Sequence, residues 1–135
     1  MATKIFVNLP VQDLDNSVAF FRALGYQFNP QMTDKTAACL VISEDIQSML
    51  LTHAKFKELA LRDVCNVAEG GEVILCLSCD SREQVDTLVR KAIAAGGKAH
   101  EEPQDYGFMY HYGFQDLDGH LWGLIYMNPS HLQKS

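Results

Sequence analysis

The chain has 135 residues, and its content of 47% hydrophobic and 21% charged residues is that of an ordinary globular protein. This length suits one domain with one core, residues 1–135, and is too short for two domains of ordinary size. Seventeen acidic residues against eleven basic ones give a net charge of -6, which opposes binding to nucleic acids and anionic membranes. We therefore expect one soluble domain with no nucleic acid or membrane partner.

The N-terminal segment and the cysteines indicate a cytoplasmic protein. Asn8 and Asp13 interrupt the apolar stretch that a signal peptide would need, and no apolar run reaches transmembrane length. The CxxC pattern at 76–79 does not predict a zinc site, because strand residues three apart point to opposite faces. It does not predict a nucleophile either, because a buried strand offers no activating base. The cysteines are too sparse for a disulfide scaffold and are interpreted as reduced thiols: Cys39, Cys65, Cys76 and Cys79.

The first half of the chain predicts a βαβββ unit over residues 1–53. Alternating apolar residues predict a strand over 4–11, with Phe6, Asn8 and Pro10 on the face opposite the aliphatic residues. A helix follows over 13–25, and three strands are expected at 26–32, 36–43 and 46–52. Residues 54–71 form a connector with a short helix at 56–61. The expected buried stripe of the first helix is Leu14, Val18, Phe21 and Leu24.

The second half repeats this plan over residues 72–128 and ends in a tail at 129–135. A strand is expected at 73–79, and Ser81 with Gln84 three residues later forms a capping box that opens a helix. Further strands are expected near Ala99, at 110–115 and at 120–127, with an Asp-Gly turn at 118–119 between the last two. The expected buried stripe of the second helix is Val85, Leu88, Val89, Ala92 and Ile93.

The two halves match at an offset of 67 residues. This offset pairs Asp13 with Asp80, which favours internal duplication over the alternative of two unrelated amphipathic helices. Two such units, with their sheets side by side, form a curved mixed sheet whose concave apolar face suits a small ligand. We therefore predict an α+β fold in which two βαβββ units are paired into a cupped mixed sheet.

Three segments resemble the vicinal oxygen chelate superfamily, which includes glyoxalases, bleomycin resistance proteins and extradiol dioxygenases. LPVQDLDNSVAFFRALGY at 9–26 is similar to the family's opening strand, helix and turn. AGGK at 95–98 and FQDLDGHLWG at 114–123 are similar to the end of its second helix and to its closing hairpin. The order and spacing of these segments extend the resemblance over nearly the whole chain.

The resemblance implies a divalent metal site with ligands on the first strand and the last strand of each unit, open to two vicinal substrate oxygens. In this sequence the corresponding positions are Phe6, Val73, Gly123 and a residue near Leu50. None of these side chains can coordinate a metal, so we predict no metal cofactor. A divalent metal remains the alternative, for instance at a displaced site of His111 with Glu101 or Glu102.

An aromatic run at 108–114 surrounds His111, and two interpretations of it stay open. The run can line the entrance of the ligand site, with the imidazole pairing with a ligand or with Tyr110 or Tyr112. Alternatively it is a half-buried strand whose aromatic residues pack on the sheet.

These observations predict a metal-free protein that binds a small hydrophobic or aromatic molecule, as the bleomycin resistance relatives do, and that forms a homodimer. The alternatives are a metal-dependent glyoxalase-type lyase or extradiol-type dioxygenase, and an interaction module without a ligand. The predicted ligand-binding residues are Phe6, Asn8, Leu50, Val73, Leu75, Tyr110, His111 and Gly123.

Overall fold

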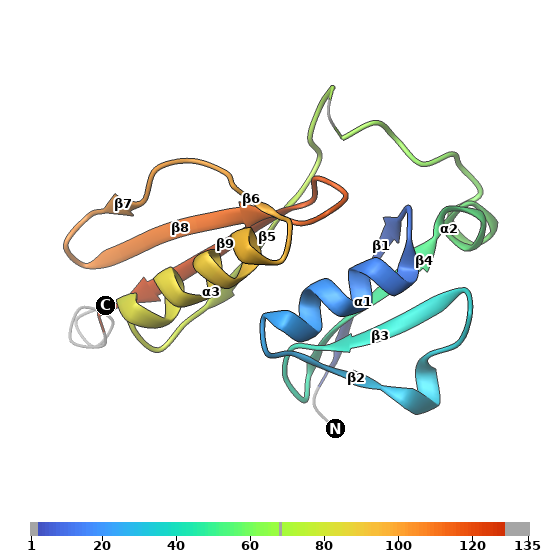
Figure 1. The fold of residues 1–135 in the computed structure, drawn as a ribbon, viewed down its shortest axis with the longest axis horizontal. Coiled ribbons are helices and arrows are strands. Elements are labelled where there is room, and N and C mark those ends of the chain that lie inside the picture. Colours follow the sequence, from blue (N-terminus) through green and yellow to red (C-terminus); the bar gives the residue numbers. More distant parts are fainter. Residues whose placement is uncertain (1–2, 68, 129–135) are drawn as a thin grey trace. The chain divides into compact units, whose positions relative to one another are not determined.

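The computed structural model describes residues 3–67 and 69–128, which form two compact units divided between Asn66 and Val67. In each unit a helix packs along one sheet, which has four strands in the first unit and five in the second (Figure 1). The predicted α+β class and the two βαβββ units are confirmed. The expected tail, residues 129–135, lies outside the described residues.

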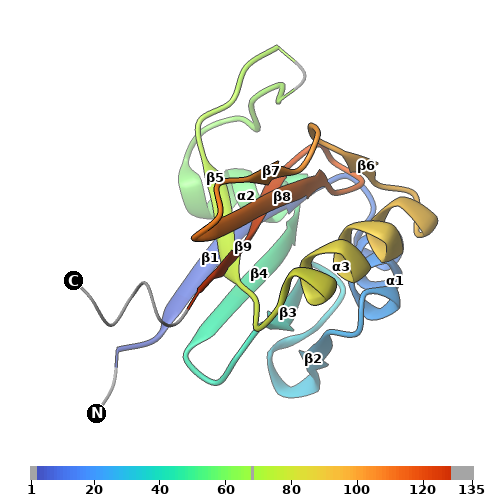
Figure 2. The same cartoon turned by 90° about the vertical axis from the view of Figure 1, so that its left-hand side faces the viewer.

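The first sheet has the strand order β1-β4-β3-β2, and all four strands are labelled in Figure 2. Strand β1 (Ile5–Val11) pairs in parallel with β4 (Ile46–Thr52), while β3 (Ala37–Val41) and β2 (Gln27–Asn29) continue the sheet antiparallel. The bounds of β4 are those expected from the sequence. Register places Leu9 beside Leu50, and both are almost fully buried. Part of the core of this unit therefore lies on the face that carries Leu9.

Helix α1 (Leu14–Ala23) begins at Asp13, whose side chain accepts a hydrogen bond from the backbone N–H of Asn16. Its buried residues are Ser17, Phe20 and Phe21, and the ring planes of the two phenylalanines are 86° apart with centroids at 5.0 Å. Phe21 and Leu24 of the expected stripe are buried, whereas Leu14 and Val18 are only half-buried, because Ser17 and Phe20 take the remaining core positions.

Two short helices alter the expected connections of the first unit. The strand expected at 26–32 stops at Asn29, because the Asn29 side chain and Pro30 open a 3-10 turn, η1 (Pro30–Met32). Helix α2 (His53–Ala60) begins directly after β4, with the Thr52 hydroxyl accepting from the N–H of Lys55. The helix expected at 56–61 thus starts three residues earlier.

The second sheet has the order β5-β9-β8-β6, with β7 also paired to β8. Strand β5 (Ile74–Ser78) is parallel to β9 (Leu121–Met127), and β8 (Met109–Gln115) is antiparallel to β9. Strands β6 (Lys98–Ala99) and β7 (Gln104–Asp105) are two residues each. The Asp-Gly turn lies between β8 and β9, as the sequence predicts.

Helix α3 (Arg82–Ala94) runs along this second sheet in both views (Figure 1 and Figure 2). The Ser81 hydroxyl accepts from the N–H of Gln84, and the Gln84 side chain accepts from the N–H of Asp80, so the helix start is capped as the sequence predicts. Val85, Val89 and Ala92 are buried, whereas Ile93 is 48% exposed.

The helix caps correct the internal offset by one residue. The two caps, Asp13 and Ser81, are 68 residues apart, and the same offset pairs the buried Phe21 with the buried Val89. Asp80 precedes the cap and is therefore not the counterpart of Asp13. No helix in the described part of the chain is long and apolar enough to span a membrane.

Candidate functional site

The face of the first sheet opposite α1 carries two of the predicted ligand residues. Phe6 and Asn8 alternate with the core residues of β1, and their register partners on β4 are Gln47 and Met49. Phe6 is 39% exposed, and Asn8 is exposed with its amide nitrogen donating to the backbone oxygen of Phe6 at 3.2 Å. This face therefore combines apolar side chains with the amide groups of Asn8 and Gln47.

Leu50 lies on the other face of this sheet, fully buried in the core. Since side chains alternate along a strand, a shift of one residue changes the face completely. Met49, which is half-buried, occupies the position on β4 that shares a face with Phe6 and Asn8.

The face of the second sheet opposite α3, which we call the distal face, carries His111 and Gly123. Register places Ile74, Cys76, Gly123 and Ile125 on this face, together with His111 of β8. Ile74 is 58% exposed and Cys76 is also exposed. The distal face thus combines aliphatic surface with one thiol and one imidazole.

Three other predicted ligand residues do not lie on the distal face. Leu75 has Trp122 as its register partner, and Trp122 belongs to the core beneath α3. The Tyr110 hydroxyl donates to Asp86 Oδ1 of α3 at 2.6 Å. Val73 precedes β5 and is 56% exposed.

The Tyr110–Asp86 hydrogen bond fixes the aromatic run against the helix. The bond to the carboxylate raises the pKa of Tyr110 to about 12, because ionised Tyr110 would lose its donor and face a second negative charge. Arg82 lies over the rings of Tyr110 and Tyr126 at 5.8 and 5.4 Å. Tyr110 therefore packs against the sheet and α3, as the second interpretation of the aromatic run expects, whereas His111 lies on the distal face.

Two paired glycines allow the close contacts at the centre of the second sheet. Gly113 and Gly123 are register partners, and a Cβ at Gly113 would lie 2.6 Å from the backbone oxygen of Trp122. A Cβ at Gly123 would lie 2.8 Å from Cys76 Sγ and 3.1 Å from His111 Nε2. The missing side chain of Gly123 thus leaves room between the thiol and the imidazole.

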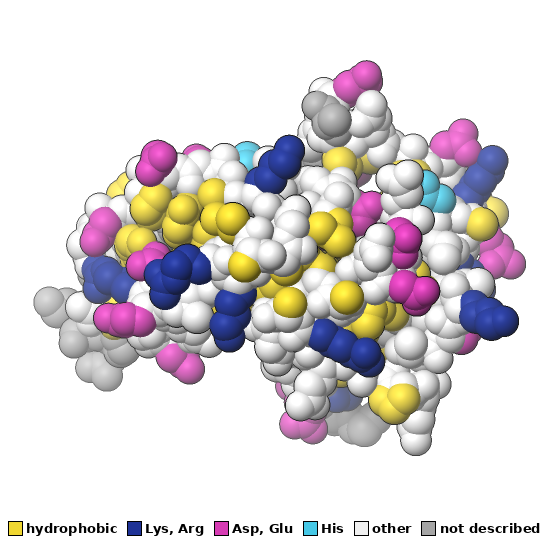
Figure 3. Space-filling view, viewed as in Figure 1, with side chains coloured by type: hydrophobic (Ala, Val, Ile, Leu, Met, Phe, Trp, Pro, Cys, Tyr) yellow, Lys and Arg dark blue, Asp and Glu magenta, His cyan; other side chains and the backbone are white. Residues whose placement is uncertain are grey.

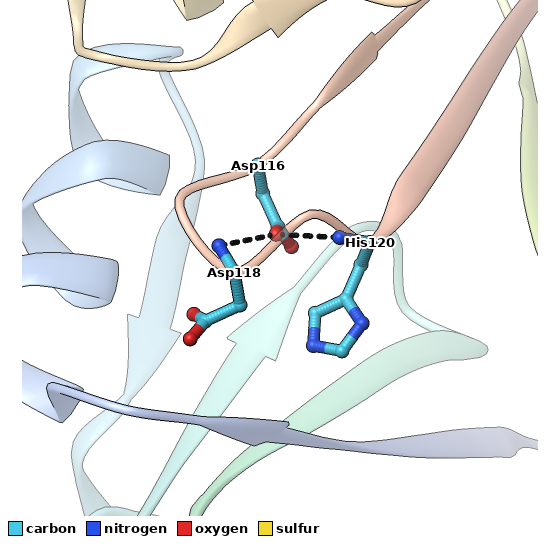
Figure 4. Close-up of side chains that lie close together, drawn as sticks. All are labelled: Asp116, Asp118 and His120. Carbon is cyan, nitrogen blue, oxygen red and sulfur yellow. Dashed lines mark hydrogen bonds between the residues drawn. The ribbon is translucent and has the colours of Figure 1, made fainter. Parts of the chain in front are cut away.

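The described residues include one group of three potential metal ligands, Asp116, Asp118 and His120 (Figure 4). Asp116 is buried, and its Oδ1 accepts from the backbone N–H groups of Asp118 and His120 at 2.9 and 3.0 Å. Its Oδ2 accepts from Trp122 Nε1 at 3.1 Å. Burial raises the pKa of this carboxyl. These bonds identify Asp116 as the residue that holds the β8–β9 turn.

The positions that the sequence analysis assigned to metal ligands do not fit a hard divalent ion. The one-residue correction moves the β5 position from Val73 to Ile74, and register gives Phe6, Met49 and Gly123 as the others. Phe, Ile and Gly have no donor side chain, and a thioether is a soft, weak ligand.

Cys76 is the residue of this site that sequence reasoning missed. A nucleophilic role was rejected because the strand was expected to be buried and without a base. The structure contradicts both points, since Cys76 is exposed and His111 lies across Gly123 from it. The alternation of Ile74 and Cys76 was visible in the sequence, but the strand register that brings them beside β9 was not.

Charged side chains of both signs are interspersed on the surface in view in Figure 3. Lysine and arginine do not gather there into one continuous patch, and hydrophobic side chains lie between the charged ones.

Comparisons with known proteins found a family model and similar solved structures. Residues 3–43 match the family model described as bleomycin resistance protein-like N-terminal. A hypothetical protein from S. aureus is 34% identical in sequence, over 93% of this chain and 95% of that one, with a TM-score of 0.78. Among proteins with curated descriptions, none matches the chain.

Two further solved structures share the fold at lower identity. A glyoxalase/bleomycin resistance protein/dioxygenase family enzyme from Burkholderia phytofirmans is 20% identical, covers 94% of this chain and all of its own, and has a TM-score of 0.79. The fosfomycin resistance protein FosX from Mesorhizobium loti is 13% identical over 98% of both chains, with a TM-score of 0.69. Together with the two βαβββ units, these matches show that the chain belongs to the vicinal oxygen chelate superfamily of glyoxalases, bleomycin resistance proteins and extradiol dioxygenases.

Proposed function

We propose that this protein is a metal-free member of the superfamily that binds a small hydrophobic or aromatic molecule, for which the sheet face opposite α1 in the first unit and the distal face of the second unit each offer apolar surface. One observation carries the proposal. Apolar residues occupy the positions that correspond to metal ligands, and two of them, Phe6 and Ile74, are 39% and 58% exposed. Large apolar side chains exposed on a sheet face gain free energy when a ligand covers them.

The chemistry of these faces favours a ligand that is mainly apolar. Phe6 offers an aromatic ring, and aromatic rings stabilise one another in offset or edge-to-face contact by about 0.5–1.5 kcal/mol beyond area burial. Asn8 is exposed beside it, so its amide can form a hydrogen bond that orients a polar group of the ligand. On the distal face, Ile74 and Ile125 offer aliphatic surface beside the imidazole of His111.

A fragment panel of small aromatic compounds, followed by ligand-detected NMR, tests this proposal. We expect binders whose signals are lost with Ile74→Asp, which places a charge on the distal face at an exposed position. Gly123→Trp should also abolish binding by filling the space beside Cys76. The matched control is Leu59→Trp, which is 58% exposed and lies in helix α2 rather than in either sheet, and it should bind as the unchanged protein does.

Circular dichroism of each variant establishes that it is folded. Unchanged affinity in folded Ile74→Asp would refute the placement of the ligand on the distal face. A panel without any binder would refute the ligand class.

A metal-dependent lyase or dioxygenase is the second candidate function. The observation that favours it is the group Asp116, Asp118 and His120, whose potential ligand atoms lie within 4.8 Å of one another. Because Asp116 Oδ1 already accepts hydrogen bonds from the turn and Oδ2 accepts from Trp122 Nε1 of β9, an ion there would compete with the bonds that hold β8 and β9. Metal binding and turn stability would then change together.

The homodimer and the cytoplasmic location stay predictions from the sequence. Light scattering tests the first directly, and a monomer at micromolar concentration would refute it.

A further inference from the structure

The geometry points to Cys76 as a reactive thiol that adds to α,β-unsaturated carbonyl compounds, with His111 as its base. This inference goes beyond the proposed function and does not rest on it, because the thiol reaction needs no prior ligand. It rests on three groups of the second unit: the thiol of Cys76 and the imidazole of His111, which flank Gly123 on the distal face, and the carboxylate of Glu101 beside the imidazole.

The thiol and the imidazole flank one small space. The ideal Cβ position at Gly123 is 2.8 Å from Cys76 Sγ and 3.1 Å from His111 Nε2. The sulfur and the nitrogen are therefore no more than about 6 Å apart, a distance that one water molecule or a small side-chain rotation spans. Because residue 123 is a glycine, no side chain separates the two groups.

The second imidazole nitrogen faces a carboxylate. His111 Nδ1 lies 3.9 Å from Glu101 Oε1, and the two side chains are 26% and 48% exposed. A carboxylate on this side favours the tautomer with its proton on Nδ1, which leaves the lone pair of Nε2 directed toward Gly123 and the thiol. This order of nucleophile, base and orienting carboxylate is the arrangement that activates thiols. Glu101 is a positioning residue here, since it acts through His111.

The reaction balances without any further reactant. His111 Nε2 takes the proton of the Cys76 thiol, and the thiolate forms a carbon–sulfur bond with the β-carbon of the unsaturated carbonyl compound. The carbon–carbon π bond breaks and its electron pair moves to the α-carbon through the enolate. The proton then passes from His111 to the α-carbon, so that the product is a thioether and the imidazole is neutral again.

The other cysteines serve as internal references. Cys65 is exposed in the connector between the two units, and no histidine or carboxylate contact of its thiol is known among the described residues. Burial raises the pKa of the Cys39 and Cys79 thiols, which lowers their thiolate fraction. Cys65 is therefore the fair comparison, because it has the exposure of Cys76 without the imidazole.

Acrylamide, a slowly reacting α,β-unsaturated amide, is the probe. The full-length protein is treated at pH 7, and the alkylation rate of each cysteine is followed by peptide mass spectrometry. We expect Cys76 to react faster than Cys65, and His111→Gln to slow Cys76 at least about tenfold while leaving Cys65 unchanged. Glu101→Gln should slow Cys76 by a smaller factor. The matched control, His100→Gln, removes the neighbouring exposed histidine and should change nothing.

Measuring the alkylation rate at a second pH distinguishes a His111 that acts as a base from a His111 that only affects access to the Cys76 thiol. Near pH 10 thiols ionise without a neighbouring base, so the difference between His111→Gln and the unchanged protein should disappear. The inference is overturned by a Cys76 rate no higher than that of Cys65. It is equally overturned by a normal rate in His111→Gln, or by a defect of that variant that persists at pH 10.

Discussion

Replacing Asp116 by alanine should destabilise the second unit strongly, because this side chain satisfies three donors at once. Two are backbone N–H groups of the β8–β9 turn, at 2.9 and 3.0 Å, and the third is Trp122 Nε1 at 3.1 Å. Trp122 is only 2% exposed, so alanine leaves its indole N–H without this acceptor in the core.

The magnitude follows from the three bonds and from the cost of burying the acid. A hydrogen bond to a charged group contributes about 1.5–3 kcal/mol and a neutral one about 1 kcal/mol. Burial raises the pKa of Asp116, so part of this gain is offset by the desolvation of the carboxylate. We therefore expect Asp116→Ala to lower the free energy of unfolding by about 3 kcal/mol.

Urea unfolding followed by fluorescence of Trp122, the single tryptophan of the chain, measures this loss at the affected site. The control is Asp118→Ala in the same turn, whose backbone N–H remains available, and it should cost at most about 1 kcal/mol. The reasoning is refuted if Asp116→Ala costs less than about 1 kcal/mol, or if both variants lose the same amount.

Three further variants test the packing of the second sheet. Tyr110→Phe should lower the free energy of unfolding by about 1.5–3 kcal/mol at neutral pH, since it removes the donor to the Asp86 carboxylate. Because the pKa of Tyr110 is raised from 10.0 to about 12, the contribution of this bond is complete below pH 10 and lost as the pH rises toward 12. Urea titrations across that range should therefore converge for the two proteins, and a constant difference would contradict the bond. Gly113→Ala should cost more than Gly123→Ala, because its Cβ meets a backbone oxygen at 2.6 Å whereas Cys76 Sγ can rotate away. Paired thermal melts decide this order, and the reverse order would show that the thiol is held in place.

Elements with strong local signals were predictable from the sequence. Strand β4 has the bounds that alternation predicted, and Ser81 with Gln84 caps α3 as the capping box indicated. The strand expected at 26–32 is shorter than predicted, because Asn29 and Pro30 begin a 3-10 helix there. Alternation also predicted correctly that Phe6 and Asn8 share a face.

The composition of the site was harder to predict, because it depends on register between distant strands. An offset wrong by one residue assigned Val73 in place of Ile74, and an uncertainty of one residue assigned Leu50 in place of Met49. Each such error moves a side chain to another face or out of the strand. Cys76 was dismissed for the same reason, since only the pairing of β5, β9 and β8 brings it near His111.

Elemental analysis of untagged protein tests the central claim most directly, with nickel, zinc, manganese and iron added back to the same sample. Our account predicts far less than one metal ion per chain, and no binding on addition, because Phe6, Ile74 and Gly123 offer no ligand atoms. One tightly held ion per chain would contradict the metal-free account and would make the lyase or dioxygenase function the leading one.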